Sequence, residues 1–134
     1  MKPLDREGRS ELHYAACDGD LATVEKLVSA GADVNLRDRR GWSPLHFAAQ
    51  ACSPEVAACL LAHGASVDPE DSFGNTPLST ATFESRGDGA VIQILRAAGA
   101  DPKKKNKSGV SALSLAMTIA NFNVAQFYDD LKEI

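Results

Sequence analysis

Residues 38–68 show the pattern on which the chain is built, because short apolar groups alternate there with polar turn residues. A polar turn containing Gly41 leads into Ser43 and Pro44, which are favoured at the N-cap and first position of a helix. Apolar and small residues follow at helical spacing, and Gly64 stands where a helix usually ends in a left-handed residue. The pattern predicts one helix–turn–helix unit with apolar surface on both flanks, which neighbouring units must cover.

The same pattern recurs along the chain. Its copies begin 33, 33 and 35 residues apart, and a segment of the type SAGADVN, AHGASVD or RAAGADP closes each of the first three. The copies of the helix start read SELHYAA from Ser10, SPLHFAA from Ser43, TPLSTAT from Thr76 and SALSLAM from Ser111. We therefore predict one domain over residues 1–134, with units at about 5–37, 38–70, 71–105 and 106–134.

These motifs resemble the ankyrin repeat, a unit of about 33 residues with the signature T-P-L-H-x-A. The resemblance extends over residues 5–131. It implies an all-α solenoid of four helix–turn–helix units with projecting β-turn fingers. It also implies a concave surface made by the fingers and the first helix of each unit, where members of the family bind other proteins.

The second helix of each of the first three units is preceded at a constant distance by a side chain that can accept a hydrogen bond. We predict that these residues cap their helices: Asp20, Ser53 and Asp88. The constant distance places the two extra residues of the third unit in its inter-helix loop, within residues 83–87. We expect this longer loop to leave both helices undisturbed.

The two ends of the chain depart from the repeat. The second helix of the first unit stays polar through Glu25 and Lys26, as suits an outer face in water. At the other end we predict a helix that closes the stack over the third unit, through Phe122, Val124, Phe127, Tyr128 and Leu131. Either Asn121 or Asn123 would cap this helix, since both alternatives leave an apolar face.

Composition and charge describe a soluble protein. The chain has 134 residues and a formal net charge of −4, and no apolar run approaches the roughly 20 residues of a membrane span. The start MKPLDREGR does not have the pattern of a signal peptide. The three cysteines have no CxxC spacing, and we expect reduced thiols that pack like alanine. The expected location is cytoplasmic, with no membrane partner and a monomeric state for the protein alone.

The candidate catalytic and metal-binding residues favour a structural interpretation. His13 and His46 hold the same repeat position, and the resemblance implies that they hydrogen-bond the backbone of neighbouring turns. His13 and Cys17 are spaced for one helix face, but two ligands are too few for a zinc site. The tripeptide that begins at Arg86 resembles an adhesion motif, yet three residues recur often by chance. No catalytic motif is present, so we expect no enzyme, no cofactor and no metal.

Basic residues gather in and beside the turn segments. Nine of the fourteen lie there: Arg6, Arg9, Arg37, Arg39, Arg40, Lys103, Lys104, Lys105 and Lys107. They form either a solvated surface or a ridge that attracts an acidic patch on a partner. The third turn is different, with Glu70 and Asp71 and no base. Because this acidic turn interrupts a continuous track for phosphates, nucleic acid is the less expected partner.

The variable positions of the resemblance give the predicted partner-binding residues. They flank the turn glycine or lie late in the first helix: Arg6, Arg9, Arg39, Arg40, Trp42, Gln50, Phe73, Asn75, Phe83 and Lys107. Trp42 and Phe73 are predicted to be apolar anchors, because aromatic residues are enriched among those that dominate binding energy. The alternative for Trp42 is that it merely packs on the neighbouring finger.

The sequence therefore predicts a non-catalytic module that binds another protein. The insertion around residues 86–89 and the ending TIANFNVAQF also resemble small free-standing bacterial ankyrin proteins, some of which act as immunity partners of toxins. That resemblance implies an inhibitor that covers the active site of a toxin or enzyme. The alternatives are a general adaptor or scaffold protein and, less expected, a nucleic-acid binder that uses the basic turns.

Overall fold

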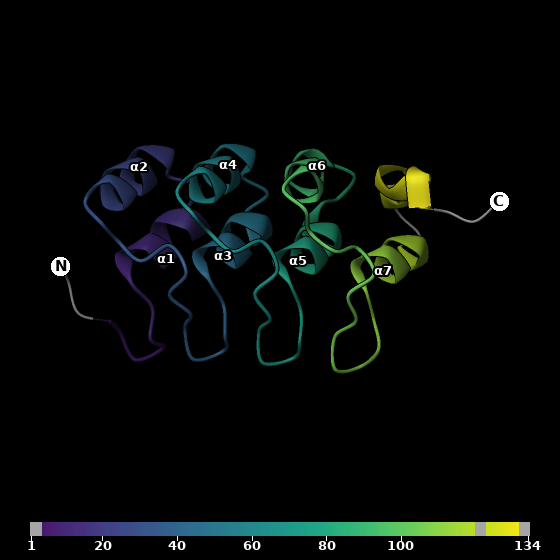
Figure 1. The fold of residues 1–134 in the computed structure, drawn as a ribbon, viewed down its shortest axis with the longest axis horizontal. Helices are drawn as coiled ribbons and strands as arrows, with labels where there is room; N and C mark the ends of the chain where they lie inside the picture. The colour runs from purple at the N-terminus through teal and green to yellow at the C-terminus, as the bar shows by residue number, and fades with distance from the viewer. Residues whose placement is uncertain (1–3, 120–122, 132–134) are drawn as a thin grey trace.

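The computed structural model describes residues 4–119 and 123–131, and it shows a stack of helix pairs with projecting turns (Figure 1). The first helices of the four units are α1 (Glu11–Cys17), α3 (Pro44–Gln50), α5 (Pro77–Glu84) and α7 (Ala112–Thr118). The second helices are α2 (Leu21–Ser29), α4 (Pro54–Ala62), α6 (Ala90–Ala97) and the 3-10 helix η1 (Val124–Leu131). These described residues contain no strand, so the predicted all-α class is confirmed.

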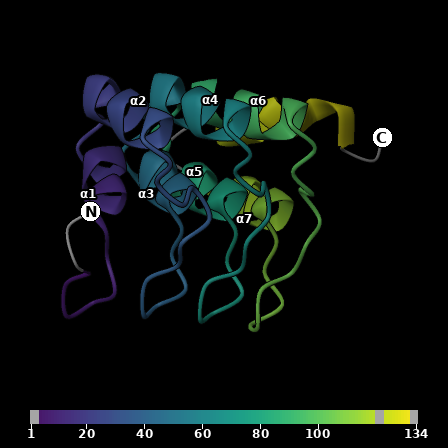
Figure 2. The same ribbon diagram turned by 60° about the vertical axis from the view of Figure 1, so that its left-hand side comes forward.

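The elements form two layers of helices and a row of fingers. The helices α1, α3, α5 and α7 make one layer, the helices α2, α4 and α6 make the other, and the fingers extend away from the first layer (Figures 1 and 2). Finger 1 to finger 4 are defined here as residues 5–10, 38–43, 71–76 and 106–111. Each finger therefore stands next to its neighbour in the repeat, and together they form one side of the molecule.

Hydrogen-bonding side chains start most helices as the sequence predicts. Ser43 caps α3 and Pro44 is its first residue, while the side chains of Asp20 and Ser53 accept backbone N–H groups at the starts of α2 and α4. The prediction for Asp88 is wrong by one residue, because the N-cap position of α6 belongs to Gly89. Asp88 instead accepts a hydrogen bond from the N–H of Ala90, the first residue of α6, at 3.1 Å.

The insertion in the third unit leaves both of its helices in place, and their ends differ by one residue from those of the second unit. Helix α5 runs to Glu84 and is one residue longer than α3, and α6 is one residue shorter than α4. The loop between α5 and α6 turns through Arg86, whose φ is 49°. A Cβ at Gly89 would overlap the ring of Phe127, so glycine at this position lets η1 approach closely.

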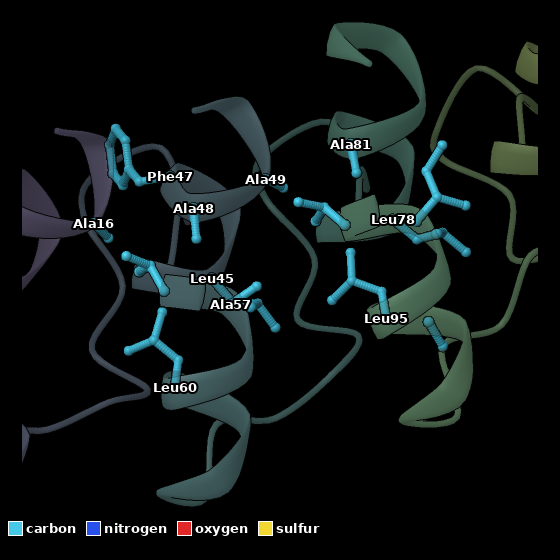
Figure 3. Close-up of a cluster of buried hydrophobic side chains, with 14 of the residues drawn as sticks. Ala16, Leu45, Phe47, Ala48, Ala49, Ala57, Leu60, Leu78, Ala81 and Leu95 are labelled. Atoms are coloured by element: carbon cyan, nitrogen blue, oxygen red, sulfur yellow. The ribbon is translucent and has the colours of Figure 1, made fainter. Parts of the chain in front are cut away.

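Leucines and alanines fill the space between the two helix layers (Figure 3). Leu45 and Leu60 of the second unit and Leu78 and Leu95 of the third are fully buried. Ala48 and its equivalents let neighbouring first helices approach closely. A fully buried leucine contributes about 2 kcal/mol relative to an exposed one, so these side chains supply much of the stability of the stack.

The two ends of the stack are closed differently. At the start, Glu25 and Lys26 of α2 are exposed, as predicted for a terminal unit. At the other end, Val124 and Tyr128 of η1 are buried, and the segment is a 3-10 helix with a kink at Tyr128. Phe127 and Leu131 pack against the core in part, while the predicted contact of Phe122 and a cap by Asn121 lie outside the described residues. The alternative cap residue, Asn123, directly precedes η1.

Hydrogen bonds tie η1 to the third unit, so the prediction that this ending covers that unit is confirmed. The hydroxyl of Tyr128 lies 2.7 Å from Thr82 Oγ1, which itself donates to the Leu78 carbonyl. The Tyr128 hydroxyl is therefore the donor to Thr82. Arg96 of α6 binds both carboxylate oxygens of Asp130 at 2.8 Å and the Phe127 carbonyl at 2.8 Å.

Candidate functional site

Each finger is built on the same turn. The side-chain oxygen of its first residue accepts the N–H groups of the residues two and four positions later, at 2.9 Å in every case. The residues that do this are Asp5, Asp38, Asp71 and Asn106. A glycine with positive φ follows three positions later, because the turn needs a left-handed residue there. The four tips therefore present their side chains from the same backbone geometry.

The finger tips are linked to one another by the backbone. The N–H of Arg39 donates to the Glu7 carbonyl at 2.8 Å, and that of Ser72 donates to the Arg40 carbonyl at 2.8 Å. At the last junction the N–H of Lys107 donates to the Phe73 carbonyl at 2.9 Å. One bond per junction fixes neighbouring tips relative to each other, which makes their side chains a pre-arranged row.

Two histidines hold the base of the fingers, as the resemblance implies. His13 Nε2 donates to the carbonyls of Leu36 and Trp42 at 2.8 and 3.1 Å, and His46 Nε2 donates to that of Asn75 at 3.0 Å. The Nδ1 atom of His46 accepts the N–H of Ser43, so the neutral ring with its proton on Nε2 fits both contacts. Burial lowers the pKa of both histidines, which favours this neutral form.

The residue after the tip glycine reaches across to the next finger. Arg9 Nε lies 3.2 Å from Asp38 Oδ2, and Trp42 Nε1 donates to Asp71 Oδ2 at 3.0 Å. At the third junction Asn106 Nδ2 donates to Asn75 Oδ1 at 2.8 Å. Three of the predicted partner-binding residues (Arg9, Trp42 and Asn75) thus have their polar groups engaged inside the chain.

Trp42 is held on its faces as well. Its ring stacks on His46 with centroids 5.4 Å apart and meets Phe47 edge-on at 4.9 Å. The guanidinium of Arg40 lies over the same ring, 5.0 Å from its centroid. Trp42 is therefore partly buried and packs on the next finger, which is the alternative that the sequence left open.

The other predicted residues are exposed and fall into two rows. The first row is at the finger tips and comprises Arg6, Arg39, Arg40, Phe73 and Lys107. The second row is late in the first helices and comprises Gln50 and Phe83. The side chains of Phe73 and Phe83 are each 68% exposed, which is unusual for large apolar groups. We name these two rows the finger-side surface. They contain the predicted partner-binding residues that are exposed in the structure.

Two exposed apolar residues near this surface are outside the predicted partner-binding set. Val110 of finger 4 and Met117 of α7 are 38% and 55% exposed. Val110 follows the tip glycine of its finger, and Met117 aligns with the buried Thr82 of the third unit. Val110 falls at a variable position of the resemblance, whereas Met117 carries no such signal, because its equivalent in the third unit is buried.

The described residues gather no metal-binding cluster. Within residues 4–119 and 123–131 no three His, Cys, Asp or Glu side chains lie together to hold a metal ion. Cys17, Cys52 and Cys59 are free thiols, and Cys17 is exposed, so the expectation that all three pack like alanine is wrong for Cys17. In the same part of the chain no helix is long and apolar enough to cross a membrane.

A family model for ankyrin repeats, covering three copies, matches residues 12–106. The chain belongs to the ankyrin repeat family. The fourth copy lies beyond the match, where finger 4 and α7 repeat the geometry of the earlier units. A comparison with curated proteins found no match. Ankyrin repeats are generally modules for protein–protein interaction.

Proposed function

We propose that this ankyrin-repeat protein binds a partner protein through its finger-side surface, without catalysing a reaction on it. The observation that carries the proposal is the exposure of Phe73 and Phe83, each 68% exposed on a side otherwise rich in charge. Aromatic and arginine side chains are enriched among the few residues that dominate interface energy. Phe73, Phe83 and Arg40 are therefore the proposed centres of the interface.

The internal hydrogen bonds of the fingers support this proposal. Arg9, Trp42 and Asn75 cross-link neighbouring fingers, so the exposed residues beside them are held before a partner arrives. Ordering a flexible side chain or loop on binding costs about 0.5–1.5 kcal/mol for each long side chain. A surface whose backbone is already fixed avoids most of the cost of ordering the fingers.

The biological role within this proposal is that of an inhibitor or immunity protein. By covering the active site of a toxin or another enzyme, the surface would block access of its substrate. The sequence resemblance of the insertion and of the chain ending to bacterial immunity-type ankyrin proteins supports this role. An adaptor that joins two proteins is the alternative, and it predicts that the partner keeps its activity in the complex.

The test is capture of partners from the native host, with identification by mass spectrometry. The Phe73→Ala/Phe83→Ala variant should lose a partner that the unmodified protein retains, while Leu4→Ala should retain it. Leu4 is the matched control because it is 50% exposed and apolar but precedes finger 1. Trp42→Ala is a poor choice, since the stacking on His46 and Phe47 means that it would also disturb the fold.

The outcome separates the proposals. A partner that binds both variants equally would show that the finger-side surface is not the binding site. If the variant loses a partner, the purified partner is assayed for its own activity with and without the ankyrin-repeat protein. Loss of activity supports the inhibitor or immunity role, whereas full activity in the complex supports the adaptor.

A further inference from the structure

The tips of the fingers carry positive charge on a protein whose formal net charge is −4. We name the row of exposed tip residues the fingertip edge, made by Arg6, Arg39, Arg40, Phe73 and Lys107. We propose that this edge binds an extended acidic segment of the partner protein, with an apolar residue of that segment lying against Phe73. This proposal rests on the proposed function and adds the chemistry of the partner.

The cations of the edge lack acidic partners inside the chain. Among the described residues no carboxylate pairs with Arg6, Arg39, Arg40 or Lys107, whereas Arg9 is paired with Asp38. The carboxylates that begin fingers 1 to 3 already accept backbone N–H groups, and Glu7 is the exposed carboxylate at the tips. The edge therefore offers four cations against one free carboxylate, and an acidic segment complements it.

The backbone bonds set the spacing of these groups. Within finger 2 the N–H of Asp38 donates to the Trp42 carbonyl, and between fingers the N–H of Arg39 donates to the Glu7 carbonyl. Each finger thus adds two hydrogen-bonded backbone arms to the row. Because hydrogen-bonded strands lie about 4.8 Å apart, neighbouring tips are about 10 Å apart. Four fingers span roughly 30 Å on this spacing, which an extended segment of about nine residues covers at about 3.3 Å per residue.

The order of side chains predicts a pattern in that segment. Arg39 and Arg40 of finger 2 and Lys107 of finger 4 stand on either side of Phe73 of finger 3. Each neighbouring tip corresponds to about three residues of an extended chain. Acidic residues should therefore lie about three positions before and three positions after one apolar residue. Arg40 lies over the Trp42 ring, 5.0 Å from its centroid, which restricts the positions that its guanidinium can take.

The same spacing disfavours nucleic acid as the occupant. The cations of finger 2 and finger 4 are separated by finger 3, whose exposed tip residues are Ser72 and Phe73 and whose first residue is Asp71. A nucleic-acid strand carries a negative charge at every nucleotide and needs a more continuous row of cations. A protein segment that alternates acidic and apolar residues matches the edge better.

The test uses three fluorescent synthetic nonapeptides in a Gly-Ser background. The first carries two acidic residues at each end and a central Leu, the second replaces the acidic residues by Gln, and the third replaces Leu by Ser. Fluorescence anisotropy should show that the first binds about tenfold more tightly than either of the others, and that its affinity falls as NaCl is raised from about 20 to about 300 mM.

Charge reversal supplies the matched controls. The Arg39→Glu/Arg40→Glu variant should lose binding of the acidic peptide, whereas Lys103→Glu/Lys105→Glu, which changes the charge equally in the adjoining loop, should keep it. Circular dichroism and thermal unfolding verify that the variants are folded. Equal binding of the acidic and Gln peptides, or no binding of any peptide, would overturn the proposal. So would tighter binding of a ten-nucleotide oligouridylate that depends on the same arginines.

The native partner distinguishes failure of this inference from failure of the proposed function. A partner that is lost by Phe73→Ala/Phe83→Ala but retained by Arg39→Glu/Arg40→Glu would overturn the acidic-segment proposal and leave the binding function standing. A partner retained by every variant would overturn both. Loss of the partner with both variants, and with neither control, supports both proposals.

Discussion

The first two repeats and the last two hold their neighbours by different groups. His13 and His46 donate to the Trp42 and Asn75 carbonyls of the following finger, whereas the third and fourth units have Ser79 and Ser114 at the same position. In the later half, the buried Tyr128 of η1 bonds Thr82, and other contacts of η1 complete the closure. The first two units are therefore held to their neighbours by a buried imidazole, and the last two by the closing segment η1.

This difference between the two pairs of repeats predicts where substitutions should reduce the stability of the stack most. A buried imidazole that bonds both its own helix start and the next finger connects two units at once, so its loss removes hydrogen bonds from both units. A serine at this position connects only within its own turn, as Ser114 does with Ser111. We expect the junctions around His13 and His46 to contribute more stability than the junction between the third and fourth units.

The largest expected effect is that of His46→Ser, which gives the second repeat the residue of the third. The change removes the bond from His46 Nε2 to the Asn75 carbonyl, which keeps only its bond from the Asp71 N–H. It also opens a cavity beside Trp42, so we expect a loss of about 3 kcal/mol in the free energy of unfolding. Urea denaturation measures it. Ser79→Ala is the matched control in the third repeat and should cost about 0.5 kcal/mol or less. Equal losses would show that the two halves do not differ in this way.

Two glycines with the same backbone conformation should differ in their tolerance of alanine. Gly41 and Gly109 have φ of 80° and 79°, but a Cβ at Gly41 would lie 2.9 Å from the Asp71 Cα, while nothing lies within 4 Å at Gly109. We expect Gly109→Ala to cost about 1 kcal/mol for the left-handed conformation alone. Gly41→Ala should cost about 1–2 kcal/mol more, because finger 3 must move. Similar unfolding midpoints for the two variants would contradict this comparison.

Lowering the pH should destabilise the first two repeats before it destabilises the last two. Burial lowers the pKa of His13 and His46, so their unfolded forms bind protons more readily than the folded ones. Stability is therefore present above the ordinary histidine pKa of about 6.5 and is lost as the pH falls below it. Each histidine contributes a slope of at most about 1.4 kcal/mol per pH unit.

The measurement is the free energy of unfolding between about pH 7.5 and 5.5. The His13→Gln/His46→Gln variant should be less stable at neutral pH and should show a flatter dependence on pH. A wild-type protein whose stability does not change over this range would rule out the two histidines as the acid-sensitive groups.

The packing of η1 on the third unit should depend moderately on the hydroxyl of Tyr128. Tyr128→Phe removes the donor to Thr82 in a buried site, and we expect a loss of about 1 kcal/mol. Tyr14→Phe is the control, because its hydroxyl bonds Asp5 at an exposed position and should change stability by a few tenths of a kcal/mol. Thermal unfolding compares the two, and a larger effect at Tyr14 would argue against a closing role for η1.

The smallest expected effect compares two junctions on the side away from the finger tips. Asn35 accepts the Ser66 N–H at 2.8 Å and donates to the Gly64 carbonyl at 3.2 Å. At the next junction Asp68 accepts the Asp101 N–H at 3.0 Å, but its buried Oδ1 has no hydrogen-bond partner among the described residues. Asp68→Asn would supply a donor there, and we expect it to stabilise the protein at pH 7 by about 0.5–1 kcal/mol.

The pH dependence sharpens this last prediction. Burial raises the pKa of Asp68, helped by the nearby charge of Asp101, so the folded protein binds this proton more tightly than the unfolded chain. The wild type therefore gains stability from Asp68 as the pH falls through its folded pKa, and the advantage of Asp68→Asn should shrink. The reverse exchange, Asn35→Asp, should destabilise at pH 7. An unstable Asp68→Asn variant would show that the carboxylate has a role that the amide cannot replace.

The repeat, its helix caps and its turn residues could be predicted from the sequence. Ser43 and Pro44 start α3 because a cap and a fixed φ act within a few residues, and Gly41 is needed by the turn in which it stands. The burial of Leu45 and Leu60 follows from helical spacing and from the need of each unit for neighbours. These features depend on residues close together in the chain, which is why a single sequence determined them, together with the family.

Only the tertiary structure decided which side chains on the fingers are exposed and unpaired. Arg9 and Arg39 both read as variable positions, yet Arg9 meets Asp38 of the next finger while no carboxylate of the described chain pairs with Arg39. Trp42 likewise bonds Asp71, which is 29 positions away. The packing of η1 against Gly89 is a contact of the same kind. Such contacts depend on how one unit is stacked on the next, and that geometry is set by the whole core rather than by the pattern within a unit.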